Sequence, residues 1–397
     1  MRTRLRYVAQ VNPLSRRFDR LRDDGLVTFL PMENVWPGVQ LDLSQVKHKS
    51  AVAVGYTRFQ SGDVVVPKIT PTFEAGRSVL IPQIPHDVGA GTTELHVVRP
   101  GPGIDPRYLL YIFLGHDFLK IGESELYGVA GQKRVPDDLI RNWAIDLPPL
   151  NEQQRIADFL DVETARIDHL RATRYKQLAL LEEREAAWRS RLFLESQSGV
   201  WVRVKHLLRA KPRYGVLVPE FVDDGVPLIR VGDLASLVNC DTLLKVPEHL
   251  SAQYSRTVTM RDDVLVAVVG ATIGKVAIVP EGAANANVNR AIAVLRVHPR
   301  NSPTLFAAWV GGREFKEQAL LATSADSAQP TLGMEDLSNF ALRWPKDDDE
   351  QRLMAKAVED HQLEMETTQI ALHRQTSLLA ERRQALITAA VTGGITV

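Results

Sequence analysis

The longest regular pattern of apolar positions lies in residues 151–195, which contain no Gly and no Pro. Apolar residues recur there at helical spacing and form one stripe. Pro148-Pro149 stands before the stretch and Ser198-Gly199 follows it, as is typical at the two ends of a helix. The pattern predicts one helix of roughly 65 Å, with the stripe Ile156, Leu160, Ile167, Leu170, Leu178, Leu181, Trp188 and Leu192.

A second stretch without Gly or Pro covers residues 350–390. Apolar residues repeat there every seven positions, which is half of a coiled-coil pattern; they are Val358, Met365, Leu372, Leu379 and Leu386, with Leu363 and Ile370 beside them. The seam is imperfect, because the companion heptad positions hold His361, Thr368, Gln375 and Arg382. We expect two long helices that pair with each other; two unrelated surface helices are the alternative.

The first 150 residues have a different pattern, in which short β-branched runs are bounded by Gly or Pro. These runs predict strands at Leu26–Pro31, Asp63–Val66, Ser78–Pro82 and Glu94–Arg99. Asp105–Phe118 has a Pro at its start and predicts one short helix.

The order of these motifs recurs later in the chain, at offsets of only 197 to 200 positions. Matching pairs include Ser61–Val66 with Arg261–Val266, Gly131-Gln132 with Ala328-Gln329, Asn142–Ile145 with Asn339–Leu342, and Gln154-Arg155 with Gln351-Arg352. Collinear matches over nearly the whole chain predict the duplication of one unit, a globular domain followed by a rod. A period of this size indicates two repeated domains and not a solenoid.

The expected fold class is α+β, with two similar mixed α/β domains joined and separated by two long antiparallel coiled-coil helices in a pseudo-twofold internal duplication. The expected parts are a globular domain at 1–150, a long helix at 151–198, a second globular domain at 199–345, and a second long helix with a C-terminal tail at 346–397.

Composition narrows the class of protein. The chain has 397 residues and a net charge of zero, so a role with nucleic acid would have to rest on local basic patches. Cys240 is the only cysteine, which excludes an internal disulfide and a Cys-rich zinc site. The basic N-terminus lacks an apolar signal core, and the longest apolar run, Val264–Val269, is too short to span a membrane. We therefore expect a cytoplasmic protein.

Motifs for catalysis are missing or incomplete. The stretch Gly270–Lys275 is one residue too short between its glycines for a phosphate-binding loop, and neither His-Glu-x-x-His nor Gly-x-Ser-x-Gly occurs. Asn12-Pro13-Leu14 resembles the start of an amino-methyltransferase motif but lacks its second Pro and its aromatic residue. The acidic cluster Asp347–Glu350 is better explained by a helix start than by a cation site. We expect neither catalysis nor a cofactor or metal in this chain.

Two basic segments on loops remain as candidates for binding. Residues 47–68 contain five basic side chains and one acid, with Tyr56 and Phe59 between them, and residues 285–300 combine Asn and Arg with no acid. Asn and Arg can read base edges in the major groove, whereas Lys and Arg also hold phosphates without reading sequence. An ordinary solvated loop is the alternative interpretation of each segment.

The candidate DNA-binding residues of the second domain are Thr272, Lys275, Asn285, Asn287 and Arg290. The glycines around Thr272 allow the backbone to approach a ligand, and Lys275 can meet a phosphate. By the duplication, the corresponding candidates of the first domain are Arg58, Lys68 and Thr70. Plain turn-making is the alternative for Gly274 and for the asparagines.

The stretch 147–161, LPPLNEQQRIADFLD, resembles the signature that opens the first conserved helix of type I restriction–modification specificity subunits. Other similar stretches are Ile167-Asp168, Leu180–Arg184, the C-terminal Leu379–Ile395, and, in the domains, Gly270–Ala277 and Gln329–Leu332. The resemblance covers essentially the whole chain. Two departures concern the helices, because the first ends EEREAAWRSRLFLES without a Val-Thr-Gly tail, and the second opens less typically at 345–351.

The resemblance implies a non-catalytic subunit in which each domain is a target-recognition domain that reads half of a bipartite DNA site. It also implies that the paired helices set the spacer and dock two methyltransferase subunits, which restriction subunits join. S-adenosylmethionine, ATP and Mg are then expected on those partner subunits. The alternatives are a non-DNA coiled-coil scaffold that holds two copies of a partner protein, and an unrecognised nuclease or methyltransferase.

Overall fold

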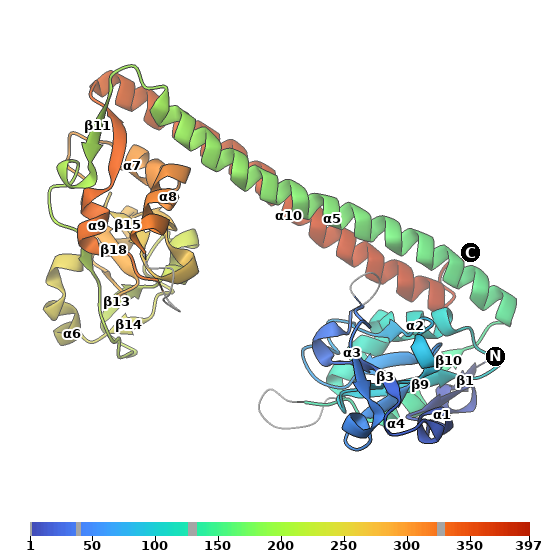
Figure 1. Cartoon of the computed structure of the whole chain (residues 1–397). Coiled ribbons are helices and arrows are strands. Elements are labelled where there is room, and N and C mark those ends of the chain that lie inside the picture. Colours follow the sequence, from blue (N-terminus) through green and yellow to red (C-terminus); the bar gives the residue numbers. More distant parts are fainter. Residues whose placement is uncertain (1, 37–40, 126–132, 324–329) are drawn as a thin grey trace. The chain divides into compact units, whose positions relative to one another are not determined.

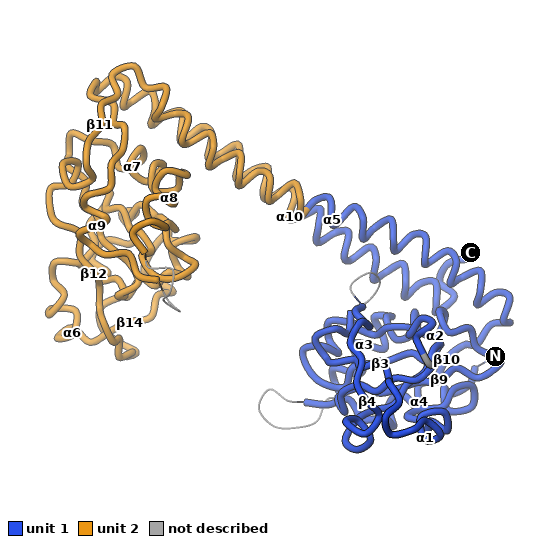
Figure 2. Tube along the Cα trace, in the orientation of Figure 1, with its two compact units in different colours: residues 1–174, 374–397 blue, residues 175–373 orange. Residues whose placement is uncertain are grey.

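The computed structural model describes residues 2–36, 41–125, 133–323 and 330–397 (Figure 1). The matching pair Gly131-Gln132 and Ala328-Gln329 lies outside the described residues. The chain divides into two compact units (Figure 2), of which unit 1 comprises residues 1–174 with 374–397 and unit 2 comprises residues 175–373. The division falls within the two long helices, so that each unit contains one globular domain and a segment of both helices.

The globular domain of unit 1 contains three sheets. The first pairs β1 (Arg2–Arg4) with β10 (Ala144–Asp146). The second has the order β2 (Ala9–Val11), β9 (Leu95–Pro100), β6 (Val64–Pro67) and β7 (Val79–Leu80). The third has the order β4 (Val46–His48), β3 (Leu26–Leu30), β8 (Gly89–Gly91) and β5 (Thr57–Phe59), with β3 and β8 parallel.

Unit 2 repeats this topology. β11 (Gly199–Arg203) pairs with β19 (Ala341–Pro345). The second sheet has the order β12 (Arg213–Tyr214), β18 (Ile292–Leu295), β15 (Val264–Ala267) and β16 (Val276–Ile278). The third has the order β14 (Lys245–Val246), β13 (Val226–Ile229) and β17 (Asn287–Val288), and its parallel pair β13–β17 corresponds to β3–β8.

The helices of the domains follow the same repeat. Unit 1 has α2 (Pro106–Leu114), α3 (His116–Ser124) and α4 (Asp137–Asn142) after a short α1 (Arg16–Arg20). Unit 2 has α7 (Pro303–Val310), α8 (Arg313–Ala322) and α9 (Met334–Asn339), together with α6 (Glu248–Gln253). α2 and α7 begin alike, with a proline in the first turn and a capping side chain before it, which is Asp105 or Ser302.

One expectation for this region is wrong. Residues 105–118 contain the whole of α2 and the start of α3 where one helix was expected, because the backbone of Gly115 is extended and ends α2. The predicted strands were nearly right: β6 starts one residue inside its predicted range, and β7 keeps only the middle of Ser78–Pro82.

Two buried ion pairs show how closely the domains repeat. In unit 1 the Asp63 carboxylate accepts hydrogen bonds from Arg99 at 2.8 and 2.9 Å, and in unit 2 Asp263 accepts two from Arg296, both at 2.8 Å. Each Asp also accepts from a backbone N–H three residues earlier in the chain. Repeated bonds at these positions support the duplication expected from the sequence.

The long helices are α5 (Leu150–Leu194) and α10 (Asp348–Val391). Inside unit 1, Arg383 of α10 forms an ion pair with Asp168 of α5 at 3.1 Å. Inside unit 2, the rings of Trp188 and His361 stack at 3.9 Å, and Glu350 bonds Ser196 beyond the end of α5, so these segments run antiparallel. All five heptad residues of α10 are buried or half-buried, whereas Leu363 and Ile370 are exposed. The expected helix pair is confirmed within each unit.

The described part of the chain has no helix with the length and apolar character that crossing a membrane requires.

Candidate nucleic-acid interface

The loop that follows β15 in unit 2 has the conformation that its glycines allow. Gly270 and Gly274 have φ angles of +62° and +88°, which L side chains rarely adopt. The Thr272 hydroxyl donates to the carbonyl of Val269 at 2.7 Å and holds the turn closed. Lys275 ends the loop with an exposed side chain that makes no ion pair within the described residues. Its ammonium group is therefore available to an anion such as a phosphate.

Asn287 lies elsewhere than expected. It is 0% exposed in β17, and its side-chain amide donates to Ser251 and Tyr254 while its carbonyl oxygen accepts from the Thr257 hydroxyl at 2.8 Å. Burial and these hydrogen bonds leave the amide no access to a base edge. This placement corrects the expectation of a base contact, because Asn287 joins β17 to the segment 251–257 and has a structural role.

Asn285 and Arg290 flank β17 and are both exposed. Asn285 adopts a φ of +65°, and its backbone N–H donates to Thr259 at 2.9 Å, so it is part of a turn. The Arg290 backbone N–H donates to Val216 at 2.8 Å, while its guanidinium group has no ion-pair partner in the described part of unit 2. Both side chains are therefore accessible to a ligand.

The three candidates of unit 1 are already engaged within the domain. Arg58 forms an ion pair with Asp19 at 2.8 Å, and its guanidinium carbon lies 4.3 Å from the centre of the Phe18 ring. The Lys68 ammonium donates to the carbonyl of Thr93 at 2.8 Å, and burial lowers the pKa of Lys68. Thr70 donates its backbone N–H to Lys133 at 3.2 Å and precedes Pro71 through a cis peptide bond. A phosphate would have to compete with these internal partners.

Strand register gives Lys275 a different counterpart in unit 1. Val64 pairs with Leu80, and Val264 pairs with Ile278, so Lys275 corresponds to Arg77. Both residues follow a glycine with positive φ, Gly76 or Gly274. Sequence reasoning missed Arg77, although its offset of 198 lies within the range of the repeat; the signal was a Gly-basic pair before a β-branched run. The Arg77 guanidinium lies 3.2 Å from the centre of the Trp36 ring.

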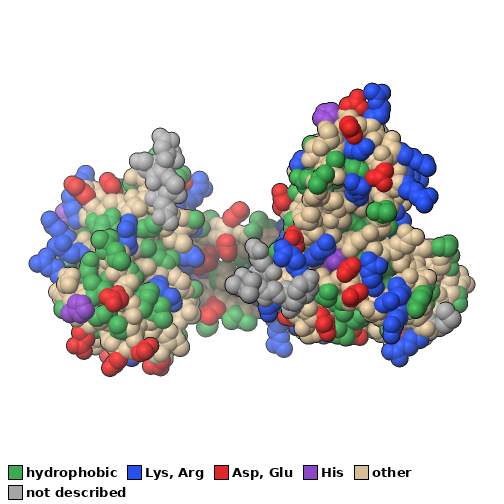
Figure 3. Space-filling model, turned by 90° about the horizontal axis from the view of Figure 1, so that it is seen from below, with side chains coloured by type: hydrophobic (Ala, Val, Ile, Leu, Met, Phe, Trp, Pro, Cys, Tyr) green, Lys and Arg blue, Asp and Glu red, His purple; other side chains and the backbone are tan. Residues whose placement is uncertain are grey.

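Unit 2 also contains an open groove of about 520 Å³. Its lining includes Arg213, Tyr214, Gln253, Tyr254, Arg256 and Met334. Arg213 and Arg256 are exposed, and neither has an ion-pair partner among the described residues. On the face of the molecule drawn in Figure 3, Lys and Arg side chains gather in clusters on each unit. Sequence reasoning missed this groove, although the basic run at 209–213 was a signal for it.

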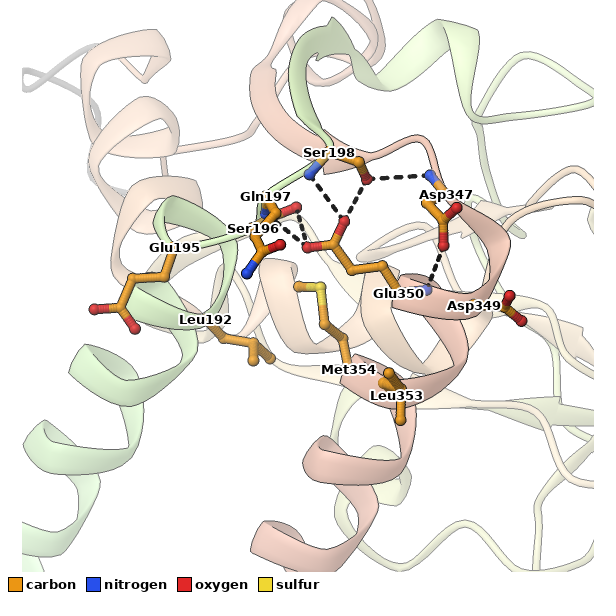
Figure 4. Close-up of a pocket in the computed structure, with 10 residues that line it drawn as sticks. All are labelled: Leu192, Glu195, Ser196, Gln197, Ser198, Asp347, Asp349, Glu350, Leu353 and Met354. Carbon is orange, nitrogen blue, oxygen red and sulfur yellow. Dashed lines mark hydrogen bonds between the residues drawn. The ribbon is translucent and has the colours of Figure 1, made fainter.

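A second cavity of unit 2, of about 670 Å³, has the opposite charge (Figure 4). Its lining includes Glu195, Asp347, Asp349 and Glu350. The Glu350 carboxylate accepts hydrogen bonds from the Gln197 and Ser198 backbone N–H groups at 2.7 and 3.0 Å and from the hydroxyls of Ser196 and Ser198. Partial burial would raise the pKa of Glu350, but these hydrogen bonds outweigh it and hold the pKa below its usual value. This surface repels phosphate and is unsuited to DNA.

The acidic cluster has a structural explanation, as the sequence indicated. The Asp347 carboxylate accepts the backbone N–H of Glu350 at 2.8 Å and caps the start of α10. The described residues contain no group of three or more His, Cys, Asp or Glu that could hold a metal ion.

Comparison with known proteins finds a family that matches one stretch of this chain. Residues 57–180 match the family described as the type I restriction modification DNA specificity domain. This match includes all of β5 to β10 and the first two-thirds of α5. The similarity to type I specificity subunits that the helix motifs indicated is confirmed.

Three relatives come from Escherichia coli. The chain is 40% identical to the type I restriction enzyme EcoAI specificity subunit over 158 residues, which are 39% of this chain and 26% of that protein. It is 37% identical to the EcoEI specificity subunit over 38% of this chain and 25% of that protein. It is 28% identical to the EcoBI specificity subunit over 56% of this chain and 52% of that protein. The matches thus span about a quarter of the first two relatives and about half of the third.

Two solved structures have the same fold over essentially their whole length. A chain from a structure of the type I R-M system is 18% identical, with a TM-score of 0.76 over 100% of this chain and 98% of that one. The HsdS subunit from Thermoanaerobacter tengcongensis is 17% identical, with a TM-score of 0.51 over 100% of this chain and 97% of that one. These likenesses confirm the α+β fold class with its long helices.

Proposed function

We propose that this chain is the DNA sequence-specificity subunit of a type I restriction–modification complex. The observation that carries this proposal is the presence, in one chain, of two copies of the same domain scaffold with different exposed residues. Each copy would read one half of a bipartite DNA site. The match of residues 57–180 to a DNA specificity domain supports this function over a scaffold that does not bind DNA.

The two long helices would set the spacer between the half-sites and dock two methyltransferase subunits. Apolar residues of their paired faces are mostly buried or half-buried, but other faces carry exposed apolar side chains, which a protein partner would cover. These include Val162 and Leu180 on α5, and Leu353, Leu363 and Ile370 on α10. Restriction subunits would join through the methyltransferases.

Catalysis would belong to the partners, together with S-adenosylmethionine, ATP and Mg. The chain itself would act as a non-catalytic subunit in the cytoplasm. Purified alone, it should neither methylate nor cleave DNA, and robust activity that survives removal of contaminants would refute this assignment.

Of the residues expected at the DNA, Lys275, Asn285 and Arg290 have the exposure that a contact needs. Lys275→Ala should weaken binding to all sequences alike and flatten its salt dependence, because a phosphate contact carries no sequence information. Arg290→Ala should relax the preference at one base pair, at a loss of roughly 1–3 kcal/mol. Unchanged affinity and preference in both variants would remove this edge of unit 2 from the interface.

Selection of bound duplexes from a randomised pool, with and without a methyltransferase partner, tests the function as a whole. A bipartite preferred site is expected. Replacing residues 199–345 by the matching domain of a relative should then change one half-site only. Inserting two heptads at matched positions in α5 and α10 should lengthen the spacer and leave the half-sites unchanged. A chain that recovers no preferred sequence under any condition would favour the non-DNA scaffold.

A further inference from the structure

We propose that the groove between β12 and the segment 253–257 is where unit 2 reads base edges, with Arg256 as the base-contacting residue and Asn287 as its positioning residue. This inference rests on the proposed function and names a reading surface for it. The ligand is the major-groove edge of duplex DNA, whose guanines present two acceptors to an arginine fork.

The charges of the groove are available to a ligand. Other arginines of unit 2 are paired, as Arg296 is with Asp263 and Arg261 is with Glu281. Arg213 and Arg256 both line the groove, are exposed and have no ion-pair partner in residues 175–323 and 330–373. An arginine without an internal partner keeps all five of its N–H donors for a phosphate or a base.

Hydrogen bonds within the protein fix the shape of the groove in the absence of a ligand. The Tyr214 hydroxyl donates to the carbonyl of Leu332 at 2.7 Å, and β12 is bonded to β18. A tyrosine hydroxyl is protonated at neutral pH, and burial raises the pKa of Tyr214 further. A preformed surface suits direct readout, because the donors need no reorganisation when the DNA binds.

Asn287 fixes the backbone around Arg256 through hydrogen bonds in the interior of the domain. Its amide nitrogen donates to the Ser251 hydroxyl at 3.1 Å and to the Tyr254 carbonyl at 3.4 Å, and its oxygen accepts from Thr257 at 2.8 Å. Tyr254 and Thr257 stand on either side of Arg256 in the chain. The buried amide therefore determines where the Arg256 side chain leaves the surface, although it touches no DNA itself.

The test uses the full chain bound to its methyltransferase partner and selection from a duplex pool randomised over both half-sites. Arg256→Ala should reduce discrimination at one base pair of the half-site read by unit 2 by roughly 5- to 150-fold. Arg256→Lys should not restore it, because Lys lacks the planar fork. Arg261→Ala, an exposed arginine outside the groove, is the matched control and should leave the preferred site unchanged.

The positioning role is tested by Thr257→Val, which removes the hydroxyl that bonds Asn287 with little change of shape. It should relax preference at the same base pair as Arg256→Ala, whereas Thr257→Ser, which keeps the hydroxyl, should restore the preference. A merely structural role would lower affinity for all sequences alike.

Wild-type preference in the Arg256→Ala variant would overturn the proposal, and so would a uniform loss of affinity with a flatter salt dependence, which marks a phosphate contact. Failure of the proposed function would look different, because the wild-type complex itself would then select no sequence.

Discussion

At the place where unit 2 carries Asn287, unit 1 carries Gly89. Both residues pair with the parallel strand that precedes them in their domain, Asn287 with Leu228 and Gly89 with Thr28. A Cβ atom at Gly89 would lie 2.2 Å from the Phe59 ring, which fills the space beside it. In unit 2 the residue two hundred positions after Phe59 is Thr259, which has no ring, and the Asn287 amide bonds Ser251 and Thr257.

The two domains also differ at the surface near Tyr56 in unit 1 and Arg256 in unit 2. Tyr56 stands seven residues before Asp63, and Arg256 stands seven residues before Asp263. Tyr56 packs edge-on against Phe29 at 5.6 Å, and the Lys47 ammonium lies 3.5 Å from the centre of the Phe29 ring. Unit 1 therefore has an aromatic surface with a cation stacked on it, where unit 2 has an exposed arginine. The two domains keep the same ion pair and differ at a surface where a ligand would touch them, which agrees with the proposed reading of two different half-sites.

The shared ion pairs give the largest effect that can test this comparison. Asp63→Ala should destabilise unit 1, and Asp263→Ala should destabilise unit 2, by up to about 3–5 kcal/mol each, because a half-buried arginine loses its partner. Hydrogen exchange resolved to β6 and β15 would measure each domain separately. Asp223→Ala, at an exposed position of unit 2, should have no effect. Unequal losses in the two domains would show that their scaffolds are not equivalent.

His96 distinguishes the two domains at acidic pH. It pairs with Val66, whereas Ala293 pairs with Val266 at the same place in unit 2. His96 is 3% exposed, its Nε2 donates to the Val135 carbonyl at 2.9 Å, and its Nδ1 accepts from Asn12 at 3.3 Å. Burial lowers the pKa of His96 to about 4, so that protonation is easier in the unfolded chain.

Unit 1 should accordingly lose stability as the pH falls from about 6.5 to about 4, by about 3 kcal/mol from this residue. Above this window the histidine is neutral in both states and the full stability is present. The His96→Gln variant keeps a neutral donor and acceptor, and should show a flatter pH dependence in urea denaturation followed by hydrogen exchange. His206→Gln, at an exposed position, serves as the control. An unchanged slope in His96→Gln would contradict the prediction.

A smaller difference is expected between Gln153 and Gln351, which make corresponding hydrogen bonds near the starts of α5 and α10. The structure thus matches Gln351 with Gln153, one residue before the Gln154 that the sequence matched with it. Gln153 accepts from the Asp105 N–H at 2.9 Å and donates to Gly103 and Pro148. Gln351 accepts from Ser302 at 3.3 Å and donates to Pro345. Substitution by Ala should destabilise each unit by about 1–3 kcal/mol, with the larger loss for Gln153.

Thermal unfolding monitored separately in the two units would measure both losses. Gln154→Ala, at the exposed neighbour of Gln153, should leave stability unchanged. Equal or reversed effects at the two glutamines would show that the number of hydrogen bonds does not set their contribution.

The smallest effect concerns Arg77 and Lys275. Arg77→Ala should destabilise unit 1 by about 1 kcal/mol through the lost stacking on Trp36. Lys275→Ala should change the stability of unit 2 by less than about 0.5 kcal/mol, because its side chain is exposed and unpaired in the described structure. Denaturant titration of both variants would measure this, and an equal loss in the two would mean that Lys275 has an internal partner.

The sequence alone determined the elements that depend on local pattern. Two stretches without Gly or Pro became α5 and α10 because helical periodicity and the lack of breakers act within a few turns of chain. The duplication was visible because the buried strands and helix starts repeat in order. The positive φ values of Gly270 and Gly274 were also readable, since few residues other than Gly adopt them.

The tertiary structure alone decided which polar residues are exposed. Asn287 belongs to a segment rich in Asn and Arg, yet its amide is buried against Ser251 and Thr257, which stand 36 and 30 positions earlier. Arg58 is held by Asp19, 39 positions away, and the groove of Arg213 and Arg256 joins segments about 40 residues apart. An amide or guanidinium group has the same chemistry wherever it stands, so only the packing of distant strands determines whether it bonds the protein or meets a ligand.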